Sequence, residues 1–150
     1  MKIFIASDHA GFNLKKELIG HLRELNYDVE DKGALTLDEN DDYPDFISLV
    51  AEEVAKNPIE HRGIVLGGSG QGEAIVANRF PGVYAALYYG SNIDIVKYSR
   101  EHNNANILSL GARFLSEEEA LDAVKLWLET DFSNDPRHVR RIGKIDQLLK

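Results

Sequence analysis

A glycine-rich stretch that follows a short apolar run constrains the fold of this chain more than any other feature. Residues 64–66 (Ile-Val-Leu) have the length and branching of a buried strand. They lead into residues 67–72 (G-G-S-G-Q-G) and then into a segment from Glu73 that can be helical. Glycine permits positive φ and close approach of a ligand, and the first turn of a helix has free N–H groups. The stretch therefore predicts a strand, a turn and a helix start that together can hold an anionic group.

Glu73 limits which anion this turn can hold. A carboxylate in the first helical turn repels a phosphate bound directly at that helix start. It suits an oxygen that becomes negative only during a reaction, next to a base that removes a proton from a neighbouring carbon. The simpler interpretation is that Glu73 only complements the helix dipole. On this stretch alone both interpretations stay open.

Strand-like and helix-like segments alternate along the whole chain. Strands are expected at about residues 2–7, 27–31, 64–66, 82–87 and 106–110. Apolar residues at helical spacing lie between and after them, and a final basic helix is expected from Pro136 to about Leu149. This order predicts a single α/β domain over residues 1–150, in which helices cover both faces of a five-stranded parallel sheet.

Polar residues follow three of the expected strands. Asp8 and His9 come directly after the first, the glycine-rich turn follows the third, and Arg113 follows the fifth. Ligands of parallel sheets bind beyond the carboxyl ends of the strands, so we expect these residues to surround one crevice. Asp8 beside His9 suits proton transfer on hydroxyl groups, and capping of the following helix is the alternative role for Asp8.

A basic segment near the end of the chain opposes the formal net charge of −8. Such an acidic chain argues against general nucleic-acid binding, which needs a basic surface. Arg137 and Arg141 are four residues apart and share one helical face, where two guanidinium groups can clamp a phosphate. The alternative is an ordinary solvated helix surface.

Other common classes of site and location fit the sequence poorly. Glu73 stands where a dinucleotide fingerprint needs its third glycine, and no G-K-[ST] follows to form a P-loop. The chain has no cysteine and its histidines form no H-x-x-x-H pair, so no metal site is expected. Ser69 lacks the G-x-S-x-G context of a hydrolase nucleophile, and hydrogen bonding within the loop is its simpler role. The N-terminus reads as a strand rather than a signal peptide, and no apolar run is of membrane-spanning length, so the cytoplasm is expected.

Seven short motifs occur in order over nearly the whole chain. They are S-D-H-A-G-F (7–12), D-Y-P-D (42–45), G-G-S-G-x-G-E (67–73), A-N (77–78), H-N-x-A-N (102–106), L-G-A-R (110–113) and R-H-x-x-R (137–141). Together they resemble the ribose-5-phosphate isomerase B family, which also includes the galactose-6-phosphate isomerase subunits. The resemblance implies aldose–ketose isomerisation of a phosphosugar, with neither a metal nor a nucleotide cofactor.

The resemblance also implies a fold and an assembly. The fold is a Rossmann-like three-layer sandwich, with helices on both faces of the parallel sheet. The assembly is a homodimer, in some members a dimer of dimers, whose active sites are shared between subunits. The helix from about residue 136 is expected to pack on or near the partner subunit.

Roles of individual residues follow from the same resemblance. His102, implicated in opening the furanose ring, and Asn103 match positions that the neighbouring subunit supplies. Ser69 is expected to help move a proton between two substrate oxygens. The other matched positions are Asp8 and His9 at the sugar ring, Tyr43 lining the site, and Arg113, Arg137 and Arg141 at the phosphate, with His138 nearby.

One departure from the family pattern concerns the base. Many members carry a cysteine at the position of Gly67, and its thiolate is the base, whereas this chain has no cysteine. It resembles instead the branch in which the glutamate at the position of Glu73 is the base. Burial would raise the basicity of Glu73 and the helix start would lower it, and the sequence does not decide between them. Backbone N–H groups of the turn, Gly68, Gly70 and Gly72 included, are then expected to stabilise an enediolate oxygen.

Two alternatives to a pentose phosphate isomerase stay open. One is an isomerase of a six-carbon sugar phosphate, such as galactose 6-phosphate or allose 6-phosphate, because the depth of the pocket is not readable from the sequence. The other is a phosphosugar-binding module without catalysis. Glu73, Ser69 and His102 together argue against such a module, because a binder needs no base opposite the glycine-rich turn.

Overall fold

All five strands of the sheet run parallel, in the order β2-β1-β3-β5-β4. The computed structural model describes residues 1–148. The strands are β1 (Lys2–Ser7), β2 (Asp28–Asp31), β3 (His61–Gly67), β4 (Ala85–Tyr88) and β5 (Ile107–Gly111). The predicted five-stranded parallel sheet is therefore confirmed.

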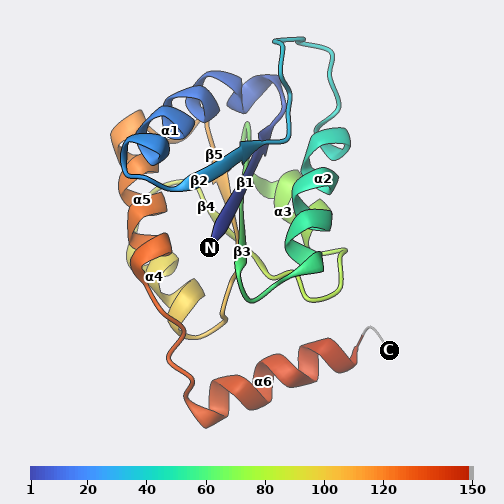
Figure 1. Ribbon diagram of the computed structural model, residues 1–150, viewed down its shortest axis with the longest axis vertical. Coiled ribbons are helices and arrows are strands. Elements are labelled where there is room, and N and C mark those ends of the chain that lie inside the picture. The colour runs from blue at the N-terminus through green and yellow to red at the C-terminus, as the bar shows by residue number, and fades with distance from the viewer. Residues whose placement is uncertain (149–150) are drawn as a thin grey trace.

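Helices cover both faces of this sheet (Figure 1). On one face lie α1 (Phe12–Glu24), α4 (Asp94–Glu101) and α5 (Glu117–Glu129), and on the other lie α2 (Tyr43–Lys56) and α3 (Gln71–Ala77). A short 3₁₀ helix, η1 (His9–Gly11), precedes α1, and α6 (Pro136–Gln147) lies below the amino ends of the strands. No helix in residues 1–148 has both the length and the apolar character needed to cross a bilayer.

Alternate side chains of the central strands pack into two separate cores. Ile3 and Ile5 of β1 pack with the side chains of α1 and α5, whereas Phe4 and Ala6 pack with those of α2 and α3. β3 and β5 repeat this alternation. Because both faces are buried, the central strands read in the sequence as continuous apolar runs.

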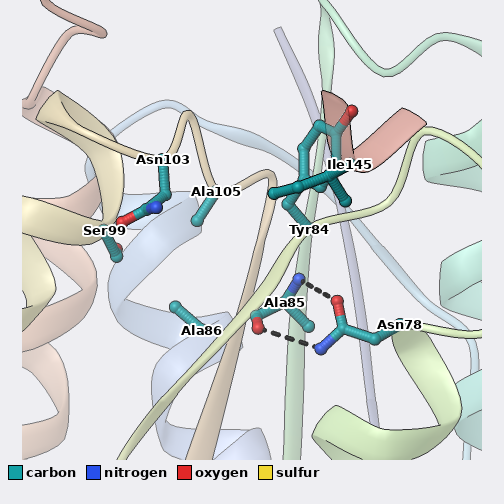
Figure 2. A pocket seen from close by; sticks show the side chains of 8 residues that line it. All are labelled: Asn78, Tyr84, Ala85, Ala86, Ser99, Asn103, Ala105 and Ile145. Atoms are coloured by element: carbon teal, nitrogen blue, oxygen red, sulfur yellow. Dashed lines mark hydrogen bonds between the residues drawn. The ribbon is translucent and has the colours of Figure 1, made fainter. Parts of the chain in front are cut away.

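The start of β4 differs from the expected strand at 82–87. Gly82 has a φ of 75° and lies in a turn in which Val83 N donates to Phe80 O. The Asn78 side chain then pairs with the first residue of β4, accepting from Ala85 N at 2.8 Å and donating to Ala85 O at 3.1 Å (Figure 2). Just before Ala85, Tyr84 N donates to Asn106 Oδ1 at 2.8 Å, a side-chain atom, so the regular ladder with β5 begins only at Ala85.

The other helices and strands fall close to their expected ranges. The capping box at the start of α5 is confirmed, since Glu119 N donates to Ser116 Oγ and Ser116 N donates to Glu119 Oε2. α6 ends at Gln147, and the expected end at Leu149 lies outside the described residues. His138 is the one buried residue in the described part of α6, so most of the surface of this helix is exposed.

Hydrogen bonds from β5 and the loop after it hold the glycine-rich turn in place. The Ser109 hydroxyl donates to Gly70 O at 2.6 Å, and Arg113 N donates to Gly68 O at 3.1 Å. Gly70 has a φ of 76°, the left-handed conformation that glycine adopts without strain, and it caps α3. The turn is therefore fixed to a central strand rather than free at the surface.

Replacing Ser109 with alanine should lower the free energy of unfolding by about 1 kcal/mol, the usual net contribution of one hydrogen bond. The effect is expected to be moderate because Gly70 O also accepts from Ala74 N, at 3.0 Å. Urea denaturation of wild type and variant measures the difference. An unchanged midpoint would contradict a holding role for this hydroxyl.

Candidate active site

A cleft of about 640 Å³ opens at the carboxyl ends of β1, β3 and β5. It lies where the strand order reverses, between β1 and β3, which is the usual position of a ligand in such sheets. The residues that line it are Asp8, Tyr43, Gly68, Ser69, Gln71, Gly72, Glu73, Ile75, Arg113 and Phe114. The crevice expected from the sequence is therefore present, with Asp8, the glycine-rich turn and Arg113 around it.

The Glu73 carboxyl group packs directly against the backbone of Gly67. Its side chain is only 4% exposed, and a Cβ added to Gly67 would overlap the carboxyl oxygens. Glu73 lies in the first turn of α3, so the helix start turns this side chain back toward the end of β3. Gly67 is thus required by the space that the carboxyl group occupies, and not by backbone conformation.

Burial is the main cause of a raised pKa at Glu73. The negative charge of Asp8 raises it further, and a hydrogen bond from the backbone N–H of Glu73 opposes the shift. The sequence left open whether burial or the helix start dominates, and in the structure burial does. A carboxyl group with a raised pKa is a stronger base once ionised.

Asp8 both caps η1 and lines the cleft. Its Oδ1 accepts from Ala10 N at 2.9 Å and from Gly11 N at 3.3 Å, so the alternative capping role is real. The same side chain lines the cleft and leaves Oδ2 4.0 Å from His9 Nδ1. His9 follows Asp8 directly but is not among the residues that line the cleft, and its ring contacts Asp41. Asp8 can therefore cap η1 and line the cleft at the same time.

Three residues of the predicted site surround the glycine-rich turn. The Tyr43 ring covers Gly72, where an added Cβ would lie 2.7 Å from the ring. The Arg113 guanidinium lies over Gly68, 3.2 Å from the position of an added Cβ. Ser69 Oγ accepts from Gln71 N at 3.4 Å, the loop hydrogen bond that was its simpler interpretation. The Tyr43 ring and the Arg113 side chain therefore each cover part of the turn.

Five predicted site residues lie at the opposite edge of the sheet. His102 and Asn103 precede β5, so they lie at the amino ends of the parallel strands, and α6 lies below that edge (Figure 1). The five residues of β5 alone separate the two edges by about 16 Å. Within one chain these residues therefore do not share a cleft with Glu73. The five are His102, Asn103, Arg137, His138 and Arg141.

Aromatic and basic side chains gather at this second location. The His102 ring stacks on Tyr98, with centroids 5.0 Å apart, and on His138, with centroids 4.5 Å apart. Burial lowers the pKa of His138, and the charges of His102 and of the arginines of α6 lower it further, while Asp135 opposes them. This accumulation of positive charge would stabilise an anionic group.

Asn103 lines a pocket of about 360 Å³ that is separate from the cleft. Asn103 approaches it from the loop after α4, and Ile145 approaches it from α6, with β4 between them (Figure 2). The Tyr84 hydroxyl, just before β4, donates to Asp146 Oδ1 and so ties α6 to the sheet. The region between α6 and β4 is therefore hollowed rather than packed.

One group of three potential metal ligands occurs among residues 1–148, namely Asp8, His9 and Asp41, whose ligand atoms lie within 4.8 Å of one another. His9 Nδ1 and Asp41 Oδ1 are 2.6 Å apart, which is a hydrogen-bond distance. Two ligands on one tetrahedral ion, each at about 2.1 Å from it, lie about 3.4 Å apart. The arrangement therefore fits a hydrogen bond between His9 and Asp41 rather than a bound ion.

The sequence model described as Ribose/Galactose Isomerase matches residues 3–145 of this chain. The chain belongs to the ribose/galactose isomerase family. Ribose-5-phosphate isomerase B of Mycolicibacterium paratuberculosis is 42% identical to it over 142 residues, which cover 95% of this chain and 87% of the relative. The family indicated by the seven motifs is therefore confirmed.

Solved structures of the ribose/galactose isomerase family share the fold throughout. Ribose-5-phosphate isomerase B of Mycoplasma genitalium, with bound ribulose-5-phosphate, has a TM-score of 0.94 and 42% identity, covering 98% of this chain and 95% of its own. The Clostridium thermocellum enzyme of the same name has a TM-score of 0.91 and 45% identity, covering 99% and 97%. The Rossmann-like sandwich is therefore confirmed, whereas the roles of single residues stay predictions.

Four residues of the site were not predicted from the sequence. Gln71 lines the cleft, as do Ile75 and Phe114, which are apolar but 61% and 62% exposed at its rim. Asp41 belongs to the acidic stretch 38–42, which reads as a solvated loop. Nothing in the sequence distinguishes Asp41 from the acids around it, because its contact with His9 joins residues 32 positions apart.

In a Gly67→Ala variant the added Cβ would overlap the Glu73 carboxyl group, so this side chain must leave its buried position. Exposure to water removes the main cause of the raised pKa, which should fall toward its ordinary value. NMR titration of the Glu73 carboxyl carbon measures the shift. Gly20→Ala in α1 is the matched control, because a Cβ there meets no atom of another segment. A Glu73 pKa equal in both variants would contradict the contact.

Proposed function

We propose that this chain is an aldose–ketose isomerase that interconverts ribose 5-phosphate and ribulose 5-phosphate. The observation that carries the proposal is the buried carboxyl group of Glu73, packed against Gly67 beside the glycine-rich turn. A carboxyl group whose pKa is raised by burial suits removal of a carbon-bound proton at neutral pH. The Mycoplasma genitalium relative with bound ribulose-5-phosphate, similar over 98% of this chain, supports the choice of substrate.

In the proposed reaction, Asp8 and His102 assist opening of the sugar ring, which exposes the aldehyde at C1. Glu73 removes the proton from C2 and returns it to C1 through a cis-enediolate, while Ser69 helps to move a proton between O1 and O2. Backbone N–H groups of residues 68–73 stabilise the enediolate oxygen, each such donor contributing about 3 kcal/mol in comparable sites. No atom is gained or lost, so substrate and product differ only in where two hydrogens lie.

The complete site is proposed to form between two copies of the chain. Glu73 and His102 lie at opposite edges of one sheet, so the His102 that acts with a given Glu73 must come from a second copy. The exposed surface of α6 and the hollow beside β4 are the surfaces that such a partner would cover. A homodimer, alone or paired into a dimer of dimers, satisfies this requirement.

The same assembly would complete the phosphate site. Arg137 and Arg141 of the partner, with His138 nearby, would meet Arg113 at the open end of the cleft. Their attraction for a phosphate far from the reacting carbons orients those carbons next to Glu73. Action in the cytoplasm is a further prediction.

The volume of the cleft and the burial of Glu73 bear on the two alternatives, a six-carbon sugar phosphate isomerase and a non-catalytic binding module. A volume of about 640 Å³ holds a five-carbon or a six-carbon sugar phosphate, so galactose 6-phosphate and allose 6-phosphate belong in the assay. A module that only binds sugars gains nothing from Glu73, because burial of an ionisable carboxyl group costs stability at neutral pH. The burial of the Glu73 carboxyl group therefore favours catalysis over binding alone.

Replacing Glu73 with glutamine should reduce kcat for ribulose 5-phosphate formation by at least about a hundredfold, because the amide cannot accept the C2 proton. A direct assay with purified protein and EDTA present measures turnover. Glu52→Gln, an exposed position on α2, is the matched control and should behave as wild type. Near-normal turnover of Glu73→Gln would require another base.

Loss of turnover in Glu73→Gln is not expected to come from unfolding. Because folding raises the pKa of Glu73, the native state holds its proton to a higher pH than the unfolded state does. Stability therefore falls as the pH rises from the unfolded pKa through the folded one. Glutamine removes this cost, so the variant should be at least as resistant to urea as wild type at neutral pH.

Mixing two inactive variants tests the shared site. Glu73→Gln and His102→Asn homodimers should each be inactive, but refolding them together should restore about a quarter of wild-type activity. Half of the dimers are then mixed, and one of their two sites has both native residues. Glu73→Gln mixed with Ser69→Ala is the control and should stay inactive, because both changes lie on the same chain's part of the site. No recovery in the first mixture would contradict sharing of the site.

A further inference from the structure

Asp41 is a nearly buried carboxylate that the proposed reaction does not use. It lies just before α2, and its side chain is 7% exposed. Its Oδ1 accepts two hydrogen bonds from one residue, from His9 N at 3.1 Å and from the ring at His9 Nδ1 at 2.6 Å. Its Oδ2 is shielded from solvent and has no hydrogen-bond partner among residues 1–148. This carboxylate therefore interacts mainly with His9.

These contacts determine which nitrogen of His9 can meet a ligand. A carboxylate only accepts hydrogen bonds, so the proton between Asp41 Oδ1 and His9 Nδ1 belongs to the ring. Nε2 is then the nitrogen left for a ligand, and the second bond, to His9 N, fixes the backbone that carries the ring. A histidine held at both its backbone and its ring loses little entropy when a substrate binds.

The charges around His9 favour the protonated ring. Asp41 makes the largest contribution to a raised pKa, and Asp8, from the adjacent position, adds to it. Partial burial and the Arg113 cation, which faces His9 from the loop after β5, lower the pKa but do not cancel the shift. A cation here also offsets the two carboxylates of the cleft, Asp8 and Glu73.

We propose that Asp41 is a positioning residue for the sugar-ring chemistry: it fixes His9 through Nδ1 and holds it as an imidazolium whose Nε2–H donates to a sugar oxygen. The inference rests on the proposed function, since it assigns a role within the same site. Asp41 acts through His9 and does not itself touch the substrate. A doubly protonated ring is a stronger donor than a neutral one, and it keeps its donor on Nε2.

A purely structural role for Asp41 is the competing explanation. The loop that carries Asp41 is already tied down at its other end, where buried Lys15 donates to Asp31 Oδ1 and to Ala34 O at 2.7 Å each. Ala34 N also donates to Ser7 O at 2.7 Å. The end of the loop next to β2 is therefore held without Asp41, and the two roles can be separated by experiment.

NMR titration of the His9 ring in the full-length protein is the first test, with its resonance assigned by a His9→Gln variant. In wild type the His9 pKa should lie above its ordinary value of about 6.5. Asp41→Asn should lower it, because the opposite charge is removed. Asp38→Asn is the matched control, since Asp38 lies in the same loop, is exposed and caps Asn40 N. A His9 pKa that is equal in Asp41→Asn and wild type overturns the proposal.

The pH dependence of kcat/KM tests whether the charge on His9 matters for the reaction. Because Asp41 raises the pKa of His9, the Asp41→Asn variant should stay close to wild type at acidic pH, where the ring is protonated in both proteins. Its activity should fall increasingly below that of wild type as the pH rises, because the variant loses the imidazolium first. A loss that is equal at all pH values overturns the proposal, because a merely structural role predicts that result.

A measurement on the wild-type protein keeps the proposal testable if Asp41→Asn does not fold. Nitrogen chemical shifts of the His9 ring above its pKa should report a proton on Nδ1, and a proton on Nε2 alone would overturn the proposal. Absence of turnover with any sugar phosphate in wild type would overturn the proposed function and, with it, the role in catalysis. The titration would then still decide whether Asp41 fixes the His9 cation.

Discussion

The pairing of β3 with β5 is the interaction on which the candidate site depends. Where these strands end, the Ser109 hydroxyl donates to Gly70 O and Arg113 N donates to Gly68 O. These hydrogen bonds fix the glycine-rich turn relative to the sheet. A rigid turn lets α3 start at Gln71, and that start directs Glu73 back against Gly67. The position of the proposed base is thus set by backbone pairing between two buried strands. The raised pKa follows from the same geometry, because the position is closed to water.

Parallel strands also divide the predicted site residues into two groups. Asp8, the glycine-rich turn and Arg113, which come directly after strands, lie at one edge, and His102, which precedes β5, lies at the other. The topology therefore keeps the carboxylates of the cleft away from His102 and from the histidine and arginines of α6. The acidic cleft and the basic residues of α6 therefore present opposite charges on different surfaces of one chain.

Most of the fold could be predicted from the sequence because its signals are local. The alternation of apolar runs and helical spacing, the capping box at Ser116 and the glycines after β3 each reflect residues close together in the chain. The start of β4 was misplaced because the Asn106 side chain accepts from Tyr84 N, and such a contact leaves no periodic pattern. Asp41 was missed for the same reason. The predicted roles of His102 and Asn103 came from family resemblance, since no local pattern marks them.

The contact between Glu73 and Gly67 links the identities of two positions in the sequence. A side chain at position 67 and a carboxyl group from position 73 compete for one volume, and a Cβ alone already overlaps the carboxyl oxygens. Because those oxygens end a flexible side chain, a larger residue at 67 fits only if the Glu73 carboxyl group moves out of this space. Residues 67 and 73 are therefore expected to change together, with glycine at 67 accompanying a long acidic side chain at 73.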